Sequence, residues 1–101
     1  MLNQNRTAEA AMITVFVPGI LRDNTGGAAE LAMPASSVRQ ALEGLETRYP
    51  SLYRSVCDET GAVRRHVNLF INSDNIRDLA GVDSELASGD VLTILPAVSG
   101  G

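Results

Sequence analysis

Alternating hydrophobic and polar positions predict a β-strand over residues 12–17, near the beginning of the chain. Ile13, Val15 and Val17 would lie on one face of this strand, and the residues between them would lie on the other face. The Pro-Gly pair at residues 18–19 is expected to end the strand, because both residue types interrupt regular structure.

A turn and a weaker strand are predicted next. Ile20 and Leu21 are expected to fold back onto the core. Residues 24–27, Asn-Thr-Gly-Gly, indicate a turn, because Asn and Gly accept the positive φ angles that tight turns need. Residues 28–33 form the weaker strand, antiparallel to the first strand in a hairpin, and Pro34 closes it.

The segment after Pro34 predicts the clearest helix. Ser37 is a good N-cap residue, and Gln40 three residues later completes a capping-box pattern. Apolar side chains then recur at helical spacing and form one stripe: Val38, Ala41, Leu42, Leu45 and Tyr49. Pro50 is expected to stop this helix.

Two more strands are predicted in the second half of the chain. Residues 66–72 alternate strictly, with Val67, Leu69 and Ile71 on one face. Residues 91–95 form the last strand, and a proline follows it directly. Both strands are rich in β-branched and large apolar residues, which is typical of sheet positions that face a core.

The segments around these strands are expected to be less regular. Residues 51–61 are a connector, with a short helical turn that places three side chains on the core: Leu52, Tyr53 and Val56. Residues 72–75 are a turn, and Ile76 begins a short edge strand. Residues 79–87 are irregular or briefly helical.

This order of elements predicts an α+β fold in which one main helix covers a mixed four- to five-stranded sheet. The last strand can pair beside the first in parallel, which is the ubiquitin-like β-grasp arrangement. A ferredoxin-like fold would need a second full helix, which the pattern does not show. We expect the domain to span residues 12–96, with residues 1–11 a disordered extension and residues 97–101 a flexible tail.

Composition narrows the class of protein. The chain has 101 residues, 45% of them hydrophobic and 20% charged, which favours one globular domain. No stretch approaches the roughly 20 apolar residues of a membrane span, and the first residues lack the apolar core of a signal peptide. A soluble cytoplasmic protein is therefore expected. The net charge is −4 without a basic stripe, which argues against nucleic-acid binding.

The residues of common active sites are scarce. All eight basic residues are arginine, so a P-loop lysine and a lysine Schiff base are excluded. His66 lies at the start of a strand on its polar face, which favours a surface histidine over a catalytic one. Cys57, the single cysteine, precedes Asp58 and Glu59, whose negative charges disfavour a thiolate. The acidic residues lack metal-ligand spacing, so neither a metal site nor an active site is expected within the chain.

A partner surface is predicted on the sheet face away from the helix. Phe16, Phe70 and Leu95 point to that face in the strand register given above. Large apolar side chains that are exposed together usually mark an interaction surface. The alternatives are that these residues are isolated from one another or are covered by the connector at residues 51–61.

The chain ends in Gly100 and Gly101, which suggests a functional C-terminus. Without a Cβ atom, two terminal glycines can enter a narrow channel, and a partner backbone can approach them closely. Five residues beyond Pro96 can reach about 17 Å from the folded body. A terminal carboxylate on such an arm can be delivered into the active site of another protein, whereas the alternative is a frayed end.

Several stretches resemble the ubiquitin-like sulfur carriers, the ThiS/MoaD family, between about Met12 and Gly101. They are residues 15–22 (Val-Phe-Val-Pro-Gly-Ile-Leu-Arg), 25–27 (Thr-Gly-Gly), 49–50 (Tyr-Pro), 65–72 (Arg-His-Val-Asn-Leu-Phe-Ile-Asn) and 88–101, which ends in Leu-Pro-Ala-Val-Ser-Gly-Gly. The ending, together with the strand before it, is the specific part. The Arg-X-X-Thr-Gly-Gly opening at residues 22–27 and the Ile-Leu-Pro-Ala-Val ending at residues 94–98 resemble the CysO-type carriers of cysteine biosynthesis. Residues 1–11 depart from the family pattern as an addition.

This resemblance implies a chemical role for Gly101 and no catalytic role for the chain. An E1-like activating enzyme would use ATP to convert the Gly101 carboxylate to an acyl-adenylate. A persulfide or sulfide would then displace AMP and leave a thiocarboxylate, while Gly100 and Gly101 lie in the partner's channel. No permanently bound cofactor is implied. The CysO-type resemblance further implies a pyridoxal-phosphate cysteine synthase as sulfur acceptor and a metal-dependent peptidase that releases the product.

Two other functions remain open at this point. A ubiquitin-like modifier would join Gly101 to target lysines through an isopeptide bond. The small subunit of molybdopterin synthase would instead hold its tail stably in a larger subunit. Covalent conjugates in cells would favour the modifier, and a stoichiometric complex would favour the synthase subunit.

Overall fold

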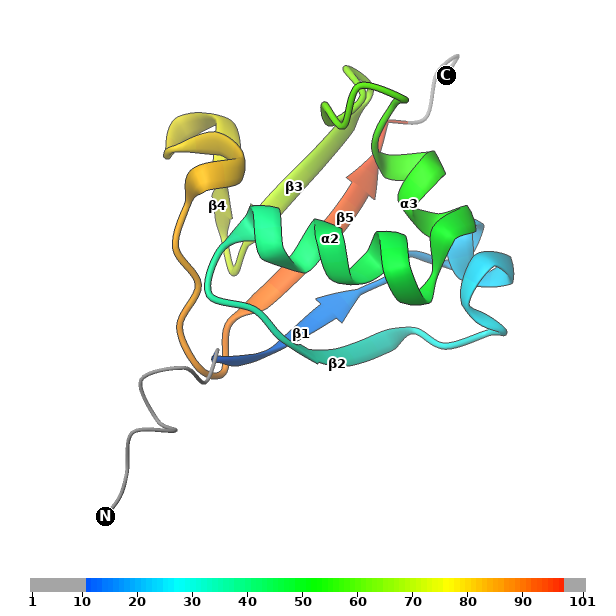
Figure 1. Ribbon diagram of the computed structural model, residues 1–101, viewed down its shortest axis with the longest axis horizontal. Helices are drawn as coiled ribbons and strands as arrows, with labels where there is room; N and C mark the ends of the chain where they lie inside the picture. Colours follow the sequence, from blue (N-terminus) through cyan, green and yellow to red (C-terminus); the bar gives the residue numbers. More distant parts are fainter. Residues whose placement is uncertain (1–10, 98–101) are drawn as a thin grey trace.

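Five strands form one mixed sheet in the computed structural model, which describes residues 11–97 (Figure 1). The strands are β1 (Met12–Phe16), β2 (Glu30–Pro34), β3 (Val67–Ile71), β4 (Asp74–Asn75) and β5 (Val91–Pro96). Their spatial order is β2-β1-β5-β3-β4. The extension predicted over residues 1–11 and the tail predicted over residues 97–101 fall almost entirely outside the described residues.

The first and last strands pair in parallel at the centre of the sheet, as predicted. Thr14 pairs with Val91 and Val15 with Leu92, whereas β3 runs antiparallel to β5 on its other side. β1 and β2 form the predicted antiparallel hairpin, in which Ile13 pairs with Met33. The α+β, β-grasp fold predicted from the sequence is therefore confirmed.

Helices α2 (Val38–Arg48) and α3 (Pro50–Val56) cover one face of the sheet (Figure 1). Side chains from the helices, the inner face of the sheet and the loop before β5 form one core: Ile13, Val15, Val17, Leu31, Met33, Ala35, Val38, Ala41, Leu42, Leu45, Leu52, Val56, Cys57, Val67, Leu69, Ile71, Ile76, Leu86, Leu92 and Ile94. The alternation predicted for the first and third strands is confirmed, because their predicted inward side chains are all buried.

The N-terminus of α2 confirms half of the predicted capping box. The Ser37 hydroxyl accepts a hydrogen bond from the Gln40 backbone N–H at 3.1 Å. The Gln40 side chain reaches one residue further back than predicted, and its amide oxygen accepts a 2.7 Å bond from the Ser36 N–H. Both bonds satisfy backbone donors that a helix start leaves without intrahelical partners.

Pro50 begins a second helix and does not simply stop the first, which corrects the predicted connector. Tyr49 breaks the helical path with φ −138° and ψ 66°, and Pro50 then takes the first position of α3. Proline is tolerated there because a first-turn residue needs no backbone N–H donor. Leu52 and Val56 are fully buried, as predicted, and Tyr53 packs partly buried against the core.

The loop between β1 and β2 forms a 3₁₀ helix, η1 (Gly19–Thr25), which the sequence pattern did not predict. Leu21 packs against the core, but Ile20 is 73% exposed, so the prediction that both fold back is wrong for Ile20. Gly26 and Gly27 have positive φ angles of 68° and 95°, which confirms the predicted turn. β2 begins at Glu30, two residues later than predicted.

The edge strand beside β3 also differs from the prediction. Its two residues are Asp74–Asn75, and Ile76 begins a short 3₁₀ helix, η2 (Ile76–Asp78), with its side chain buried. The Asn75 side chain accepts a 2.9 Å hydrogen bond from the Arg77 N–H and so caps this helix. A third short helix, η3 (Gly81–Asp83), agrees with the predicted briefly helical segment.

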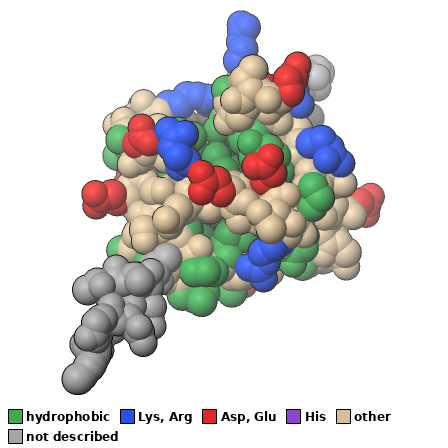
Figure 2. All heavy atoms as spheres, in the orientation of Figure 1, with side chains coloured by type: hydrophobic (Ala, Val, Ile, Leu, Met, Phe, Trp, Pro, Cys, Tyr) green, Lys and Arg blue, Asp and Glu red, His purple; other side chains and the backbone are tan. Residues whose placement is uncertain are grey.

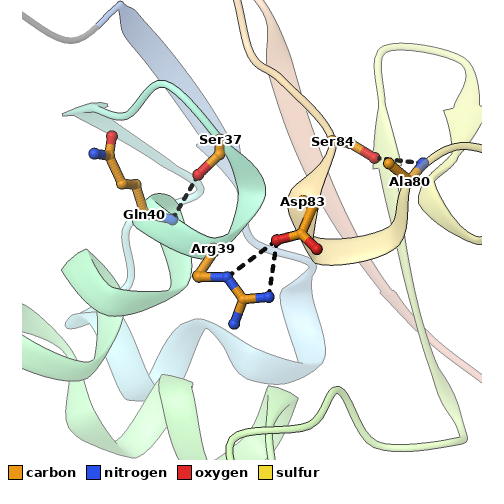
Figure 3. Close-up of polar contacts among 6 residues, drawn as sticks. All are labelled: Ser37, Arg39, Gln40, Ala80, Asp83 and Ser84. Carbon is orange, nitrogen blue, oxygen red and sulfur yellow. Dashed lines mark hydrogen bonds and ion pairs between the residues drawn. The ribbon is translucent and has the colours of Figure 1, made fainter.

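The segment before β5 is joined to the start of α2 (Figure 3). Ser84 is buried, with 5% of its surface exposed. Its hydroxyl accepts a 3.0 Å hydrogen bond from the Ala80 N–H, and its backbone carbonyl accepts a 3.0 Å hydrogen bond from the Val38 N–H. Arg39 and Asp83 form a 2.8 Å ion pair nearby. Because both charged side chains are largely exposed, we assign the stabilisation of this junction chiefly to the buried serine and the backbone bonds.

The helix-bearing face shows acidic and basic side chains interspersed, with apolar side chains between them (Figure 2). On this face, the basic side chains of the described residues do not form a continuous stripe. No helix among residues 11–97 is both long and apolar enough to cross a membrane. Within the same residues, no group of three or more His, Cys, Asp or Glu side chains is placed to hold a metal ion.

Candidate functional site: the outer sheet face and the tail exit

Phe16, Phe70 and Leu95 all lie on the sheet face opposite the helices. Phe16 and Phe70 both pair with Thr93 of β5, one from β1 and the other from β3. Leu95 is two residues further along β5 and 49% exposed. The predicted grouping is therefore present in the structure, and its role as a partner surface stays a prediction.

The connector at residues 51–61 does not cover this face. Its helical part, α3, packs Leu52 and Val56 into the core from the opposite side of the sheet. The guanidinium of Arg22 lies over the Phe16 ring instead, 5.7 Å from its centroid. Arg22 is held in place by a 2.9 Å hydrogen bond from its Nε atom to the Val17 carbonyl, so the outer face combines apolar area with a fixed cation.

The chain leaves the sheet at the end of β5. Pro96 pairs with Val67, and the Ala97 N–H donates a 2.6 Å hydrogen bond to the His66 carbonyl. The ladder between β3 and β5 thus holds the chain as far as Ala97. Gly100 and Gly101, the residues predicted to react and to enter a partner's channel, lie outside the described residues.

A surface hollow of about 390 Å³ lies beside this exit, and we call it the tail-base hollow. Its lining comes from η1, α3, the start of β3 and the end of β5: Ile20, Leu21, Ser55, Arg64, His66, Pro96 and Ala97. This site was not predicted from the sequence, because Ile20 was expected to lie in the core. The exposed position of Ile20 follows from η1, whose tight turns present Leu21 to the core and Ile20 to solvent.

Cys57 is a core residue. It is 1% exposed, and burial raises the pKa of its thiol to about 11, with the charge of Asp58 adding to the increase. Burial is the larger cause, and the predicted effect of acidic neighbours is confirmed for Asp58 but not for Glu59, which is not among the groups that raise this pKa. His66 is exposed at the start of β3, as predicted.

Asp58 organises the loop that leads to β3. One of its carboxylate oxygens accepts hydrogen bonds from the Thr60 N–H at 2.8 Å, the Thr60 hydroxyl at 2.6 Å and the Ala62 N–H at 3.2 Å. These donors favour the charged form and lower the pKa of Asp58. The sequence pattern indicated only the negative charge of Asp58 beside Cys57, whereas the structure also gives this residue a role in fixing the loop.

The fold and the exit together define a ubiquitin-like β-grasp protein in which the central strand β5 is the last strand of the described residues. Residues 15–101 match the model of the ThiS family. The chain therefore belongs to this family, as its resemblance to the sulfur carriers indicated, and it is a sulfur carrier protein of the ThiS/MoaD type.

Individual relatives agree with this assignment. The sulfur carrier protein CysO of Mycobacterium tuberculosis (strain H37Rv) is 34% identical over 91 residues, which cover 88% of this chain and 98% of the relative. A chain in the crystal structure of the Amycolatopsis orientalis BexX/CysO complex is 34% identical, with a TM-score of 0.81 and coverage of 88% and 99%. Small archaeal modifier protein 1 from Methanosarcina acetivorans is 33% identical, with a TM-score of 0.77 and coverage of 90% and 97%.

Proposed function

We propose that the protein carries sulfur as a thiocarboxylate on Gly101 and acts as a protein cosubstrate of other enzymes. The observation that carries this proposal is the position of the exit, at the end of the central strand of a ThiS-family fold. Ala97, the last of the described residues, is hydrogen-bonded to the sheet, and the four residues that follow it can span at most about 14 Å. Gly101 can therefore enter an active site while the folded body stays outside.

The chemistry has two steps. A carboxylate is a poor electrophile, so an E1-like activating enzyme first uses ATP: the Gly101 carboxylate attacks the α-phosphorus, and pyrophosphate leaves. Hydrosulfide then attacks the acyl carbon of the adenylate, the bond to AMP breaks, and a thiocarboxylate and a proton are formed. The chain supplies the reacting carboxylate and the binding surface, whereas the partner supplies the catalytic groups. ATP is thus a substrate of the partner and not a cofactor of this chain.

The sulfur acceptor proposed is a pyridoxal-phosphate cysteine synthase, with a metallopeptidase to release the amino acid. Similarity to CysO over most of both chains supports this destination. The outer face formed by Phe16, Phe70 and Leu95 is proposed to contact the partner enzymes. The Amycolatopsis complex supports the existence of such contacts in the family, since a CysO chain is there bound to the protein BexX.

A second candidate function is a ubiquitin-like modifier joined to other proteins through Gly101. Similarity to small archaeal modifier protein 1 favours it. Both functions begin with the same adenylate, and they differ in the nucleophile that displaces AMP. A sulfur nucleophile gives the carrier, and a lysine amine gives the modifier.

Intact mass measurement tests the proposal. The protein is incubated with the E1-like activating enzyme of its source organism, ATP and sulfide, and the expected product is heavier by the exchange of one oxygen for one sulfur at Gly101. Deletion of Gly101, or one residue added after it, should abolish the mass change and leave the melting temperature unchanged. Sulfur on the extended variant without prior trimming would show that the mechanism is wrong. Amide-linked conjugates in place of the thiocarboxylate would support the modifier.

A further inference from the structure

We propose that the tail-base hollow is a recognition site for the enzyme that activates Gly101, and that it receives an apolar side chain flanked by a carboxylate. This inference rests on the proposed function and specifies how the partner is recognised. It concerns the hollow beside η1, whose lining residues do not include the outer-face residues Phe16, Phe70 and Leu95.

The length of the chain beyond the sheet places the partner against this hollow. Ala97 lines the hollow, and only four residues separate it from the reacting carboxylate of Gly101. Those four residues span at most about 14 Å, so the mouth of any channel that receives Gly101 must open close to Ala97. The partner surface around that mouth then faces Ile20 and Pro96.

Ile20 is presented to solvent by a well-defined local structure. It is the most exposed of the large hydrophobic side chains in the described part of the chain, at 73%. The Leu21 N–H donates a 2.9 Å bond to the Pro18 carbonyl, and the Thr25 hydroxyl lies 3.0 Å from the Arg22 carbonyl and 2.8 Å from that of Ala28. Because η1 is fixed in this way, an apolar contact with Ile20 orders few additional side chains and retains most of its binding energy.

The basic residues at the hollow favour an acidic group on the partner. The titratable groups that line it, Arg64 and His66, are both basic, although the chain carries a net charge of −4. The Nε atom of Arg64 donates a 2.9 Å bond to the Arg54 carbonyl, which positions its guanidinium. A guanidinium held at the rim of an apolar hollow is suited to a carboxylate on the partner.

Leu79 provides a matched control. It is also an exposed leucine-sized side chain, 49% accessible, but it follows η2 and lines a separate hollow formed with Ser84 and Glu85. The same substitution can therefore be made at the tail exit and away from it. Neither Ile20 nor Leu79 belongs to the buried core, so both aspartate variants should keep the melting temperature of the wild type.

The test measures ATP–pyrophosphate exchange by the E1-like activating enzyme of the source organism, with the carrier concentration varied. We expect Ile20→Asp to raise the KM for the carrier by at least about tenfold with little change in kcat, since recognition and not chemistry is lost. Leu79→Asp should stay within about twofold of the wild type. If Ile20→Asp does not fold, Ile20→Ser makes the same test with a smaller expected increase. Salt should raise the KM of the wild-type carrier because it screens the interaction of Arg64 with a partner carboxylate, and this increase should be smaller for Arg64→Gln.

The outcomes separate this inference from the proposed function. Wild-type exchange activity together with an unchanged KM for folded Ile20→Asp would overturn the inference and leave the carrier function intact. Equal increases for the Ile20 and Leu79 variants would also overturn it, because the effect would then be unrelated to the tail exit. No exchange with the wild-type chain would overturn the proposed function itself.

Discussion

Phe16 and Phe70 lie on either side of Thr93, in one row across β1, β5 and β3 on the face opposite the helices. Both rings are half-buried, whereas the residues before and after them in the chain, such as Val15 and Leu69, are fully buried on the other face. Alternate residues of these strands therefore differ in role: the inward-facing side chains form the core, and the outward-facing side chains form the surface proposed to bind partners.

Phe70→Asp should therefore weaken partner binding with little loss of stability. We expect the free energy of unfolding to fall by no more than about 1 kcal/mol, the size of a lost cross-strand contact. Leu69→Ala, one residue earlier, should cost about 2–5 kcal/mol because it empties part of the core. Chemical denaturation measures both values. A loss for Phe70→Asp as large as that for Leu69→Ala would show that the Phe70 ring is a core group.

Ser37→Ala should destabilise the domain by about 1 kcal/mol, because it removes the hydroxyl that accepts the Gln40 N–H bond at the start of α2. Ser37→Asp should keep most of the stability, since a carboxylate can accept the same bond. Ser36→Ala is the matched control, because Ser36 contributes its backbone N–H and not its side chain to the cap. Thermal melting compares the three variants, and equal losses for Ser36→Ala and Ser37→Ala would contradict the cap.

Cys57 should resist alkylation in the native protein and react fully after denaturation. Its pKa is raised from 9.0 to about 11, so the native thiol stays protonated at neutral pH as well as being buried. A pKa that is higher in the folded state favours folding below pH 9 and loses that contribution as the pH rises toward 11. Mass spectrometry after iodoacetamide treatment at pH 8 checks the first point. Rapid labelling without unfolding would contradict the burial.

The loop at residues 58–62, which is held by hydrogen bonds to the Asp58 carboxylate, should lose stability at low pH. The pKa of Asp58 is lowered below its ordinary value of 3.8 by the hydrogen bonds from Thr60 and Ala62. The stabilising contribution is therefore present above pH 3.8 and is lost as the pH falls through the lower, folded-state pKa. Asp58→Asn should reduce this part of the acid dependence, and denaturation curves between neutral and acidic pH compare the two proteins. Identical acid dependence would contradict the assignment.

Much of the fold could be predicted because its signals are periodic. The apolar stripe from Val38 to Leu45 and the alternation in β1 and β3 depend on regular spacing, which a sequence displays directly. The end of α2 before Pro50 was predicted, but the helix that begins at Pro50 was not, because a proline is compatible with both the end of one helix and the first turn of the next. Its actual role depends on the backbone angles of Tyr49, which spacing does not reveal.

The candidate site was predictable only in part for a similar reason. The outward direction of Phe16, Phe70 and Leu95 follows from strand alternation, whereas the role proposed for Gly101 rests on the family resemblance and the Gly-Gly ending. The tail-base hollow depends on the 3₁₀ path of η1, which brings Ile20 beside Pro96 although 75 residues of sequence lie between them. Short 3₁₀ turns have weak sequence signals, so the placement of both residues at one hollow is visible only in the assembled structure.

The central position of β5 has a mechanical consequence. A force applied to the C-terminus along β5 would act in shear on the hydrogen bonds that join β5 to β1 and β3. Many of these bonds would then have to break at the same time. A tail attached to an edge strand could instead be peeled away one bond at a time. A partner that binds the residues after β5 can therefore hold them tightly without separating β5 from β1 and β3.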